Sequence, residues 1–124
     1  MGLFSVFQNN ENKKNKSYIK NLLEVAIADG QLDESELKVI INIAAKFDIT
    51  KNEVLSIKDN HPTIEFTPPS SYSAKVKLLE DLILVITADK IIEKDEISFC
   101  REIANKLDIN AALVDDLLEA HDKS

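Results

Sequence analysis

The chain has 124 residues, of which 44% are hydrophobic and 30% charged, a composition that predicts one globular domain with its own core. Its formal net charge is −7. Because residues 1–20 carry four Lys and one Glu, the rest of the chain carries −10. Such an acidic surface repels the phosphate backbone of nucleic acids, so we expect cations or basic protein surfaces as partners, and no nucleic acid.

Three observations favour a cytoplasmic protein. The single cysteine, Cys100, cannot form an internal disulfide, which is typical of a reducing compartment. The longest apolar run, Leu82–Ile86, is far shorter than the roughly 20 residues that span a bilayer. No secretory signal is recognisable, because the basic cluster follows the apolar start instead of preceding it. We therefore expect a protein that does not itself cross a membrane.

The N-terminal segment, residues 1–16, is predicted to be an apolar lead followed by a polar linker. The helical domain is expected over residues 17–124. Two interpretations of the apolar lead stay open. Either Leu3, Phe4 and Phe7 pack onto the domain, or the segment is a weak anchor for a membrane or a partner, aided by the lysines that follow.

Apolar residues at helical spacing predict helices in the rest of the chain, and no segment alternates as a strand would. The predicted stripes are Ile19, Leu22, Leu23, Ala26 and Ile27; Leu37, Ile40, Ile41, Ala44 and Phe47; Val54 and Ile57; Val76, Leu78, Leu79, Leu82, Ile83, Val85 and Ile86; Ile97, Cys100, Ile103, Ala104 and Leu107; and Val114, Leu117 and Leu118. Ser17 is expected to begin the first helix, and the proline-containing segment Asn60–Ser73 to connect two halves. The wide stripe after this connection predicts a central helix that is buried on more than one side.

The second half of the chain repeats the first at an offset of 60 residues. Segment 22–54 aligns without a gap onto segment 82–114, and 11 of the 33 aligned pairs are identical. The units of such a repeat usually cover their apolar faces with one another. The sequence therefore predicts an all-α bundle built from two pseudo-symmetric repeats.

The most distinctive repeated stretch is acidic and reads ADGQLDESEL at residues 28–37 and ADKIIEKDEI at residues 88–97. It matches the later positions of an EF-hand calcium loop. However, such a loop needs oxygen donors at its first and third positions, which here are Val25 and Ile27. We therefore do not expect an EF-hand.

Helix capping explains much of the acidic stretch. Gly30 is expected to end one helix in a left-handed conformation, and Asp33 to cap the next. Glu36, three residues later, can complete a capping box. Asp48 and Asp108, which occupy equivalent turns in the two halves, are expected to adopt left-handed geometry.

Asp29 and Asp89 fit a purely structural role less well. A carboxylate at the C-terminus of a helix meets the negative end of the helix dipole, which costs a few tenths of a kcal/mol. Two explanations stay open for both residues. The side chain accepts hydrogen bonds from the start of the following helix, or it meets a cation.

The doubled Ala-Asp-Gly-x-Leu-Asp-x-x-Glu-Leu pattern in an acidic, helical chain of this length resembles the TerB-like family. That family is named for tellurite resistance and also supplies the N-terminal domain of DjlA-type co-chaperones. The resemblance covers the chain from about residue 17. It implies a bundle of about seven or eight helices, a cytoplasmic stress-related role, and association with membrane-bound protein partners.

The resemblance also implies that the repeated acidic residues bind a divalent metal. The implied ligands are Asp29, Asp33, Glu36, Asp89, Glu93 and Glu96. Carboxylates without His or Cys favour Ca²⁺, Mg²⁺ or Mn²⁺ over Zn²⁺. Lys90, which replaces the glycine in the second copy, would bring a positive charge beside any second metal.

Sequence patterns for catalysis are absent. With only Gly2 and Gly30, the chain contains no phosphate-binding loop and no nucleophile elbow. His61 and His121 lack metal-ligand partners at helical spacing and are expected on the surface, whereas Cys100 occupies an apolar core position. We predict a non-enzymatic module without a small-molecule substrate. It either binds a divalent cation or acts as a metal-free adaptor whose acidic face docks a basic or membrane-associated protein.

Overall fold

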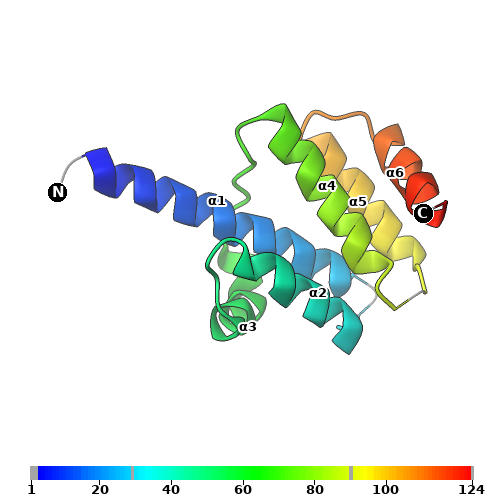
Figure 1. The fold of residues 1–124 in the computed structure, drawn as a ribbon, viewed down its shortest axis with the longest axis horizontal. Helices are drawn as coiled ribbons and strands as arrows, with labels where there is room; N and C mark the ends of the chain where they lie inside the picture. Colours follow the sequence, from blue (N-terminus) through cyan, green and yellow to red (C-terminus); the bar gives the residue numbers. More distant parts are fainter. Residues whose placement is uncertain (1–2, 29, 90, 124) are drawn as a thin grey trace.

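The computed structural model describes residues 3–28, 30–89 and 91–123, with side chains from residue 11 onward, and in these ranges it is all-helical and contains no strand (Figure 1). The elements are α1 (Leu3–Ala26), α2 (Glu34–Ala45), α3 (Lys51–Asn60), the 3-10 turn η1 (His61–Thr63), α4 (Tyr72–Ile86), α5 (Lys94–Lys106) and α6 (Ala112–Asp122). The all-α prediction is confirmed. The described residues form six α-helices where about seven or eight were expected, because the proline-containing connector adds only a single 3-10 turn.

Helix α1 begins fourteen residues earlier than predicted, at Leu3 instead of Ser17. The expected linker contains no Pro or Gly, so nothing in it interrupts a helix. Ser17 lies inside α1, fully buried, and its Oγ accepts a hydrogen bond from the backbone N–H of Thr67 at 2.8 Å. Figure 1 shows that the N-terminal half of α1 extends beyond the other helices, whereas its C-terminal half lies among them.

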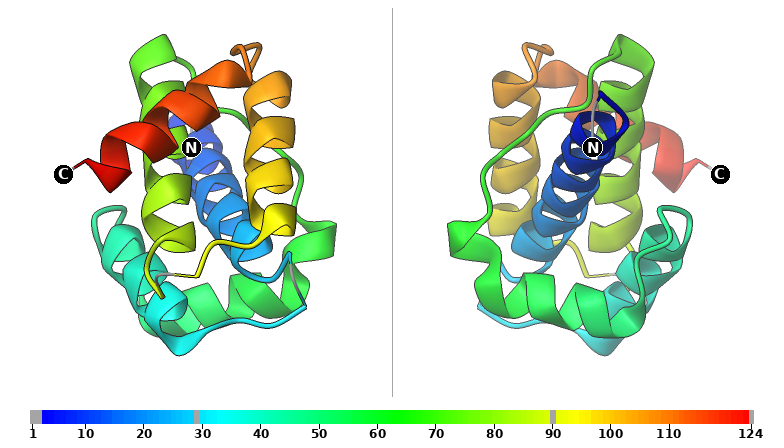
Figure 2. Two further views of the ribbon diagram at one scale, coloured as in Figure 1. Left: turned by 90° about the vertical axis from the view of Figure 1, so that its right-hand side faces the viewer. Right: turned by 90° about the vertical axis from the view of Figure 1, so that its left-hand side faces the viewer.

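Helix α4 is the central helix, as predicted. Its buried residues are Leu78, Leu79, Asp81, Leu82, Ile83, Val85 and Ile86. They lie on several sides of the helix because α4 contacts α1, α2, α5 and α6 (Figure 2). Ser71 caps its N-terminus by accepting a hydrogen bond from the N–H of Ala74 at 3.1 Å.

The predicted turn chemistry is confirmed at several positions. Gly30 has a φ of +97°, and both Asp48 and Asp108 have a φ of +59°, which places all three in the left-handed region. Thr50 and Glu53 form a capping box at the start of α3: the hydroxyl of Thr50 accepts from the N–H of Glu53 at 3.2 Å, and the Glu53 carboxylate accepts from the N–H of Thr50 at 3.0 Å. Local hydrogen bonding therefore sets where these helices begin and end.

Helix boundaries recur at the 60-residue offset. Helices α1 and α4 end at Ala26 and Ile86, and helices α2 and α5 begin at Glu34 and Lys94. The starts of α2 and α5 lie at the same end of the bundle (Figures 1 and 2). This common end is where the two copies of the acidic stretch meet.

Candidate functional site at the Glu36–Glu96 pair

Glu36 and Glu96 occupy equivalent positions in the two halves, and both are buried, with 2% and 1% of their surface exposed. Each is the third residue of its helix. This position folds the side chain back over the helix start. One carboxyl oxygen of Glu36 accepts the N–H of Asp33 at 3.4 Å, and the corresponding oxygen of Glu96 accepts the N–H of Glu93 at 3.0 Å. Capping therefore positions both side chains but uses only one oxygen of each.

The carboxyl group of Glu96 lies close enough to Glu36 to act on the pKa of Glu36. Burial, in the first place, and then the hydrogen bond and charge of Glu96 raise the pKa of Glu36 to about 9. The negative charge of Asp89 contributes in the same direction. With both groups ionised, the Oε2 atom of Glu36 would have no donor among the described residues, whereas a proton shared by the pair supplies one. The pair therefore retains one proton at neutral pH.

The other predicted ligands are placed differently. Asp33 is exposed and accepts hydrogen bonds from the N–H of Ser35, at 2.8 Å, and from the Ser35 hydroxyl, so it acts as the N-cap of α2. Glu93 is exposed at the start of α5. Asp89 is half-buried, and its Oδ1 accepts the N–H of Ile91 at 3.0 Å. That hydrogen bond links the side chain of Asp89 to the backbone two residues later, a pattern common for Asp.

Two residues of the predicted sites, Asp29 and Lys90, lie outside the described residues. Among the residues that are described, no group of three or more His, Cys, Asp or Glu side chains is arranged to hold a metal ion. The fold brings together Glu36 and Glu96, one from each half, with Asp89 close enough for its charge to act on Glu36. It does not draw Asp33 or Glu93 into this cluster.

Cys100 lies one helical turn after Glu96 and is fully buried, in the position that Ile40 occupies in the first half. Burial, and then the charge of Glu96, raise the pKa of its thiol to about 12. The thiol therefore stays protonated and is a poor nucleophile. This agrees with the predicted role of Cys100 as a small core residue.

A third buried carboxylate, Asp81 on α4, was not singled out from the sequence. The hydroxyl of Tyr18 donates to its Oδ2 at 2.5 Å, and the ammonium of Lys77 lies 3.2 Å from its Oδ1. Burial and the bond to Asp81 raise the pKa of Tyr18 well above its usual value, so the donor is retained. This contact joins α1 to α4. The charge of Asp81 is balanced by Lys77, although its Oδ1 accepts no hydrogen bond from the described residues.

His61 also departs from its prediction as a surface residue. It is half-buried, and its Nδ1 lies 2.8 Å from a carboxylate oxygen of Glu24 on α1. The contact holds η1 against α1. It also positions the connector between the halves, which contains η1. It joins residues 37 positions apart, so no local pattern could indicate it.

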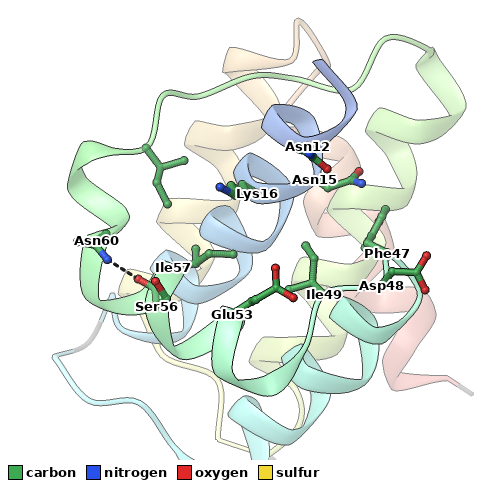
Figure 3. Close-up of a pocket in the computed structure, with 11 residues that line it drawn as sticks. Asn12, Asn15, Lys16, Phe47, Asp48, Ile49, Glu53, Ser56, Ile57 and Asn60 are labelled. Carbon is green, nitrogen blue, oxygen red and sulfur yellow. Dashed lines mark hydrogen bonds between the residues drawn. The ribbon is translucent and has the colours of Figure 1, made fainter. Parts of the chain in front are cut away.

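A cavity of about 720 Å³ lies away from the Glu36–Glu96 pair (Figure 3). Its lining residues are Asn12, Asn15, Lys16, Phe47, Asp48, Ile49, Glu53, Ser56, Ile57, Asn60 and Ile64. A second cavity of about 380 Å³ lies towards α4 and shares Asn15 and Phe47 with the first. Neither cavity was predicted, because the wall formed by α1 was expected to be a linker.

No model of a known protein family matches the chain, and neither a characterised protein nor a solved structure is significantly similar to it. The resemblance to the TerB-like family rests on the doubled acidic pattern and stays a prediction. In the described part of the chain, no helix has the length and hydropathy needed to cross a bilayer.

Proposed function

We propose that this protein is a non-enzymatic TerB-like module that binds a divalent cation between two pseudo-symmetric halves. The observation that carries the proposal is the buried contact between Glu36 and Glu96, in which Oε2 of Glu36 has no donor when both groups are ionised. Two carboxylates this close and this buried need a positive charge between them. That charge is either a proton or a metal ion.

The donor set favours a hard cation. Glu36 and Glu96 would be the ligands contributed by the helices, and Asp29 and Asp89, in the loops before them, would be the further candidates. Only oxygen donors are involved, which suits Ca²⁺, Mg²⁺ or Mn²⁺, and water can complete the coordination of such ions. Asp33 and Glu93 would act as helix caps next to the site.

Isothermal titration calorimetry of the metal-stripped chain with each of these ions tests the proposal. We expect saturable binding in the wild type and its loss in Glu36→Gln and in Glu96→Gln. Because the apo pair holds one proton at neutral pH, binding should also release a proton, so the measured heat should change with the ionisation enthalpy of the buffer.

Glu53→Gln is the matched control. Glu53 occupies the same third position in the capping box of α3 but is exposed, and among the described residues no carboxyl group is paired with it. This variant should bind as the wild type does. Absence of heat in the wild type, or binding that survives Glu36→Gln, would contradict the proposed site.

A second candidate function is favoured by the protonated state of the pair. If a proton satisfies Glu36 and Glu96 permanently, they only join the halves, and the protein acts as a metal-free adaptor. Its acidic face would then dock a basic or membrane-associated protein. In that case Glu36→Gln, whose amide can replace the shared proton as donor, should keep full stability, and divalent ions should not change the melting temperature of the wild type. In both cases we place the module in a stress response of the tellurite-resistance type.

A further inference from the structure

We infer that a cavity in the first half of the molecule binds a short zwitterionic peptide, of the size of a di- or tripeptide with apolar side chains. This is the cavity of about 720 Å³ formed by α1, the turn between α2 and α3, and α3, and we call it the α1–α3 cavity. Its volume falls within the range of about 300–1,000 Å³ that is usual for small-molecule sites. Because it lies away from the Glu36–Glu96 pair, the inference is independent of cation binding.

The α1–α3 cavity has an apolar floor and a polar rim. The floor residues are buried or half-buried, and they are Phe47, Ile49, Ile57 and Ile64. The rim residues are exposed, apart from the half-buried Asn15, and they are Asn12, Asn15, Lys16, Asp48, Glu53, Ser56 and Asn60. Figure 3 shows the residues of α1 and those of α3 on facing sides. An apolar base below a small number of convergent polar groups is the usual composition of a ligand site.

Contacts outside the cavity hold its floor in place. The ring centroid of Phe47 lies 4.9 Å from that of Tyr18, whose hydroxyl donates a hydrogen bond to Asp81. The carbonyl oxygen of Ile64 accepts a hydrogen bond from the ammonium group of Lys20 on α1. A ligand therefore meets a preformed surface, and little conformational entropy is lost in ordering that surface on binding.

The second half of the molecule fills the equivalent place with apolar side chains. The frame is the same, because α4 contacts α6 as α1 contacts α3. Both α1 and α4 are continuous helices, so the 60-residue offset extends along them and pairs Lys16 with Val76. The same offset pairs Glu53 with Leu113, and both apolar residues pack against the core. The fold therefore tolerates apolar packing at this place, whereas the first half has charged residues there.

The charges on the two sides of the cavity suit a zwitterion. Lys16 lies on α1, and Asp48 and Glu53 lie on the turn and on α3. In the described part of the chain, no carboxylate forms an ion pair with Lys16. Oε1 of Glu53 accepts the hydrogen bonds from Thr50, so the cap leaves Oε2 for a ligand. A ligand with one carboxylate and one ammonium group would form charge-assisted hydrogen bonds at both ends.

The amide side chains of the rim favour a peptide over other zwitterions. Each amide of Asn12, Asn15 and Asn60 has a donor and an acceptor, as each peptide group does. The amide of Asn60 donates to the carbonyl oxygen of Ser56 at 2.9 Å and keeps its own oxygen as an acceptor (Figure 3). A single amino acid has no peptide group for these amides and is too small to cover the floor of a cavity of about 720 Å³.

Isothermal titration calorimetry of the metal-free protein with trileucine tests the inference. This peptide has both free termini, and its side chains match the apolar floor. We expect saturable binding with a Kd of about 10 µM to 1 mM. N-acetyltrileucine, which lacks the ammonium group, and trileucine amide, which lacks the carboxylate, should each bind at least about tenfold more weakly. Free leucine should also bind at least about tenfold more weakly, because it lacks the peptide groups.

Two variants assign the termini of the peptide to the two sides of the cavity. Lys16→Met keeps the apolar stem but loses the charge, so it should bind trileucine and trileucine amide equally. Asp48→Asn/Glu53→Gln should likewise bind trileucine and N-acetyltrileucine equally, while Asn still tolerates the left-handed turn and Gln still fits the capping box. Lys51→Met is the matched control, because Lys51 is exposed on α3 and does not line the cavity. It should keep the wild-type preference for a free carboxylate.

The second half supplies a further variant. Lys16→Val/Glu53→Leu places the apolar residues of the second half in the first and should abolish trileucine binding without changing the helical circular dichroism. Absence of saturable binding to the wild type up to about 10 mM trileucine would overturn the inference. So would equal binding of the acetylated or amidated peptide or of leucine, or a preference for the free carboxylate that persists in Lys16→Met. The protein is metal-free throughout, so these outcomes are separate from the test of the cation site.

Discussion

Three glutamates in this chain occupy the same position in a helix but differ in burial and in pKa. Glu36, Glu53 and Glu96 are each the third residue of a helix and each accept the backbone N–H of the capping residue. Glu53 remains exposed, and the hydrogen bonds from Thr50 lower its pKa. Glu36 is buried against Glu96, and its pKa is raised. The same capping chemistry is therefore only structural in one place and creates a candidate site in the other.

The difference arises from what the fold places opposite each cap. Helices α2 and α5 begin at one end of the bundle, so their capping glutamates meet, whereas α3 begins with its glutamate facing solvent beside a cavity. Local sequence determines the cap, and tertiary arrangement determines whether a second carboxylate lies within reach. Predictions that compare these glutamates test this distinction.

The largest expected effect is on the pH dependence of stability. The pKa of Glu36 is higher in the folded state than its ordinary value near 4.5. The neutral side chain therefore stabilises the folded protein fully below about pH 4.5, and this stabilisation is lost as the pH rises towards about 9. The free energy of unfolding of the metal-free protein should fall by up to about 1.4 kcal/mol per pH unit in this window. Urea unfolding at a series of pH values measures the slope.

Substitution at the glutamates shows which of them causes the slope. Glu36→Gln cannot ionise and should flatten the profile between pH 5 and 9, because the amide keeps a donor for Glu96 at every pH. Glu53→Gln should leave the slope as in the wild type. A steep profile that persists in Glu36→Gln would show that another group titrates.

Asp81 provides a further comparison with the Glu36–Glu96 pair, because this buried carboxylate accepts a hydrogen bond from the hydroxyl of Tyr18. Tyr18→Phe removes the hydroxyl that donates to its Oδ2 and leaves a buried charge facing only Lys77. We expect a loss of about 2 kcal/mol in the free energy of unfolding, the usual effect of removing a partner from a buried charged group. The loss should be measured by chemical denaturation at pH 7. Tyr72→Phe, at an exposed tyrosine on the same helix as Asp81, should have no measurable effect.

Several features were predictable from sequence because they depend on residues close together in the chain. The caps at Asp33, Thr50 and Ser71 and the left-handed turns at Asp48 and Asp108 all follow from local hydrogen bonding or backbone sterics. The burial of α4 followed from its wide apolar stripe. These elements define an all-α fold.

The remaining features depend on contacts between distant residues. The 60-residue offset places Glu36 and Glu96 at equivalent positions, but only the crossing of the helices brings two equivalent side chains into contact. The Tyr18–Asp81 and Glu24–His61 contacts likewise join separate helices. The full length of α1 was missed for another reason: residues 8–16 are polar throughout, and polarity alone does not distinguish a linker from an exposed helix.

The smallest expected effect compares the two halves directly. Asp48 and Asp108 have the same φ of +59° after α2 and α5. Substitution by Ala removes a side chain that tolerates this conformation, and each variant should lose about 1 kcal/mol of stability. Gly at either position should restore the wild-type value to within a few tenths of a kcal/mol, since glycine adopts the conformation without steric cost.

Chemical denaturation of the four single variants measures these differences. Equal losses for Asp48→Ala and Asp108→Ala would show that the two turns are energetically equivalent. Unequal losses would show that the halves differ even where their backbone geometry agrees.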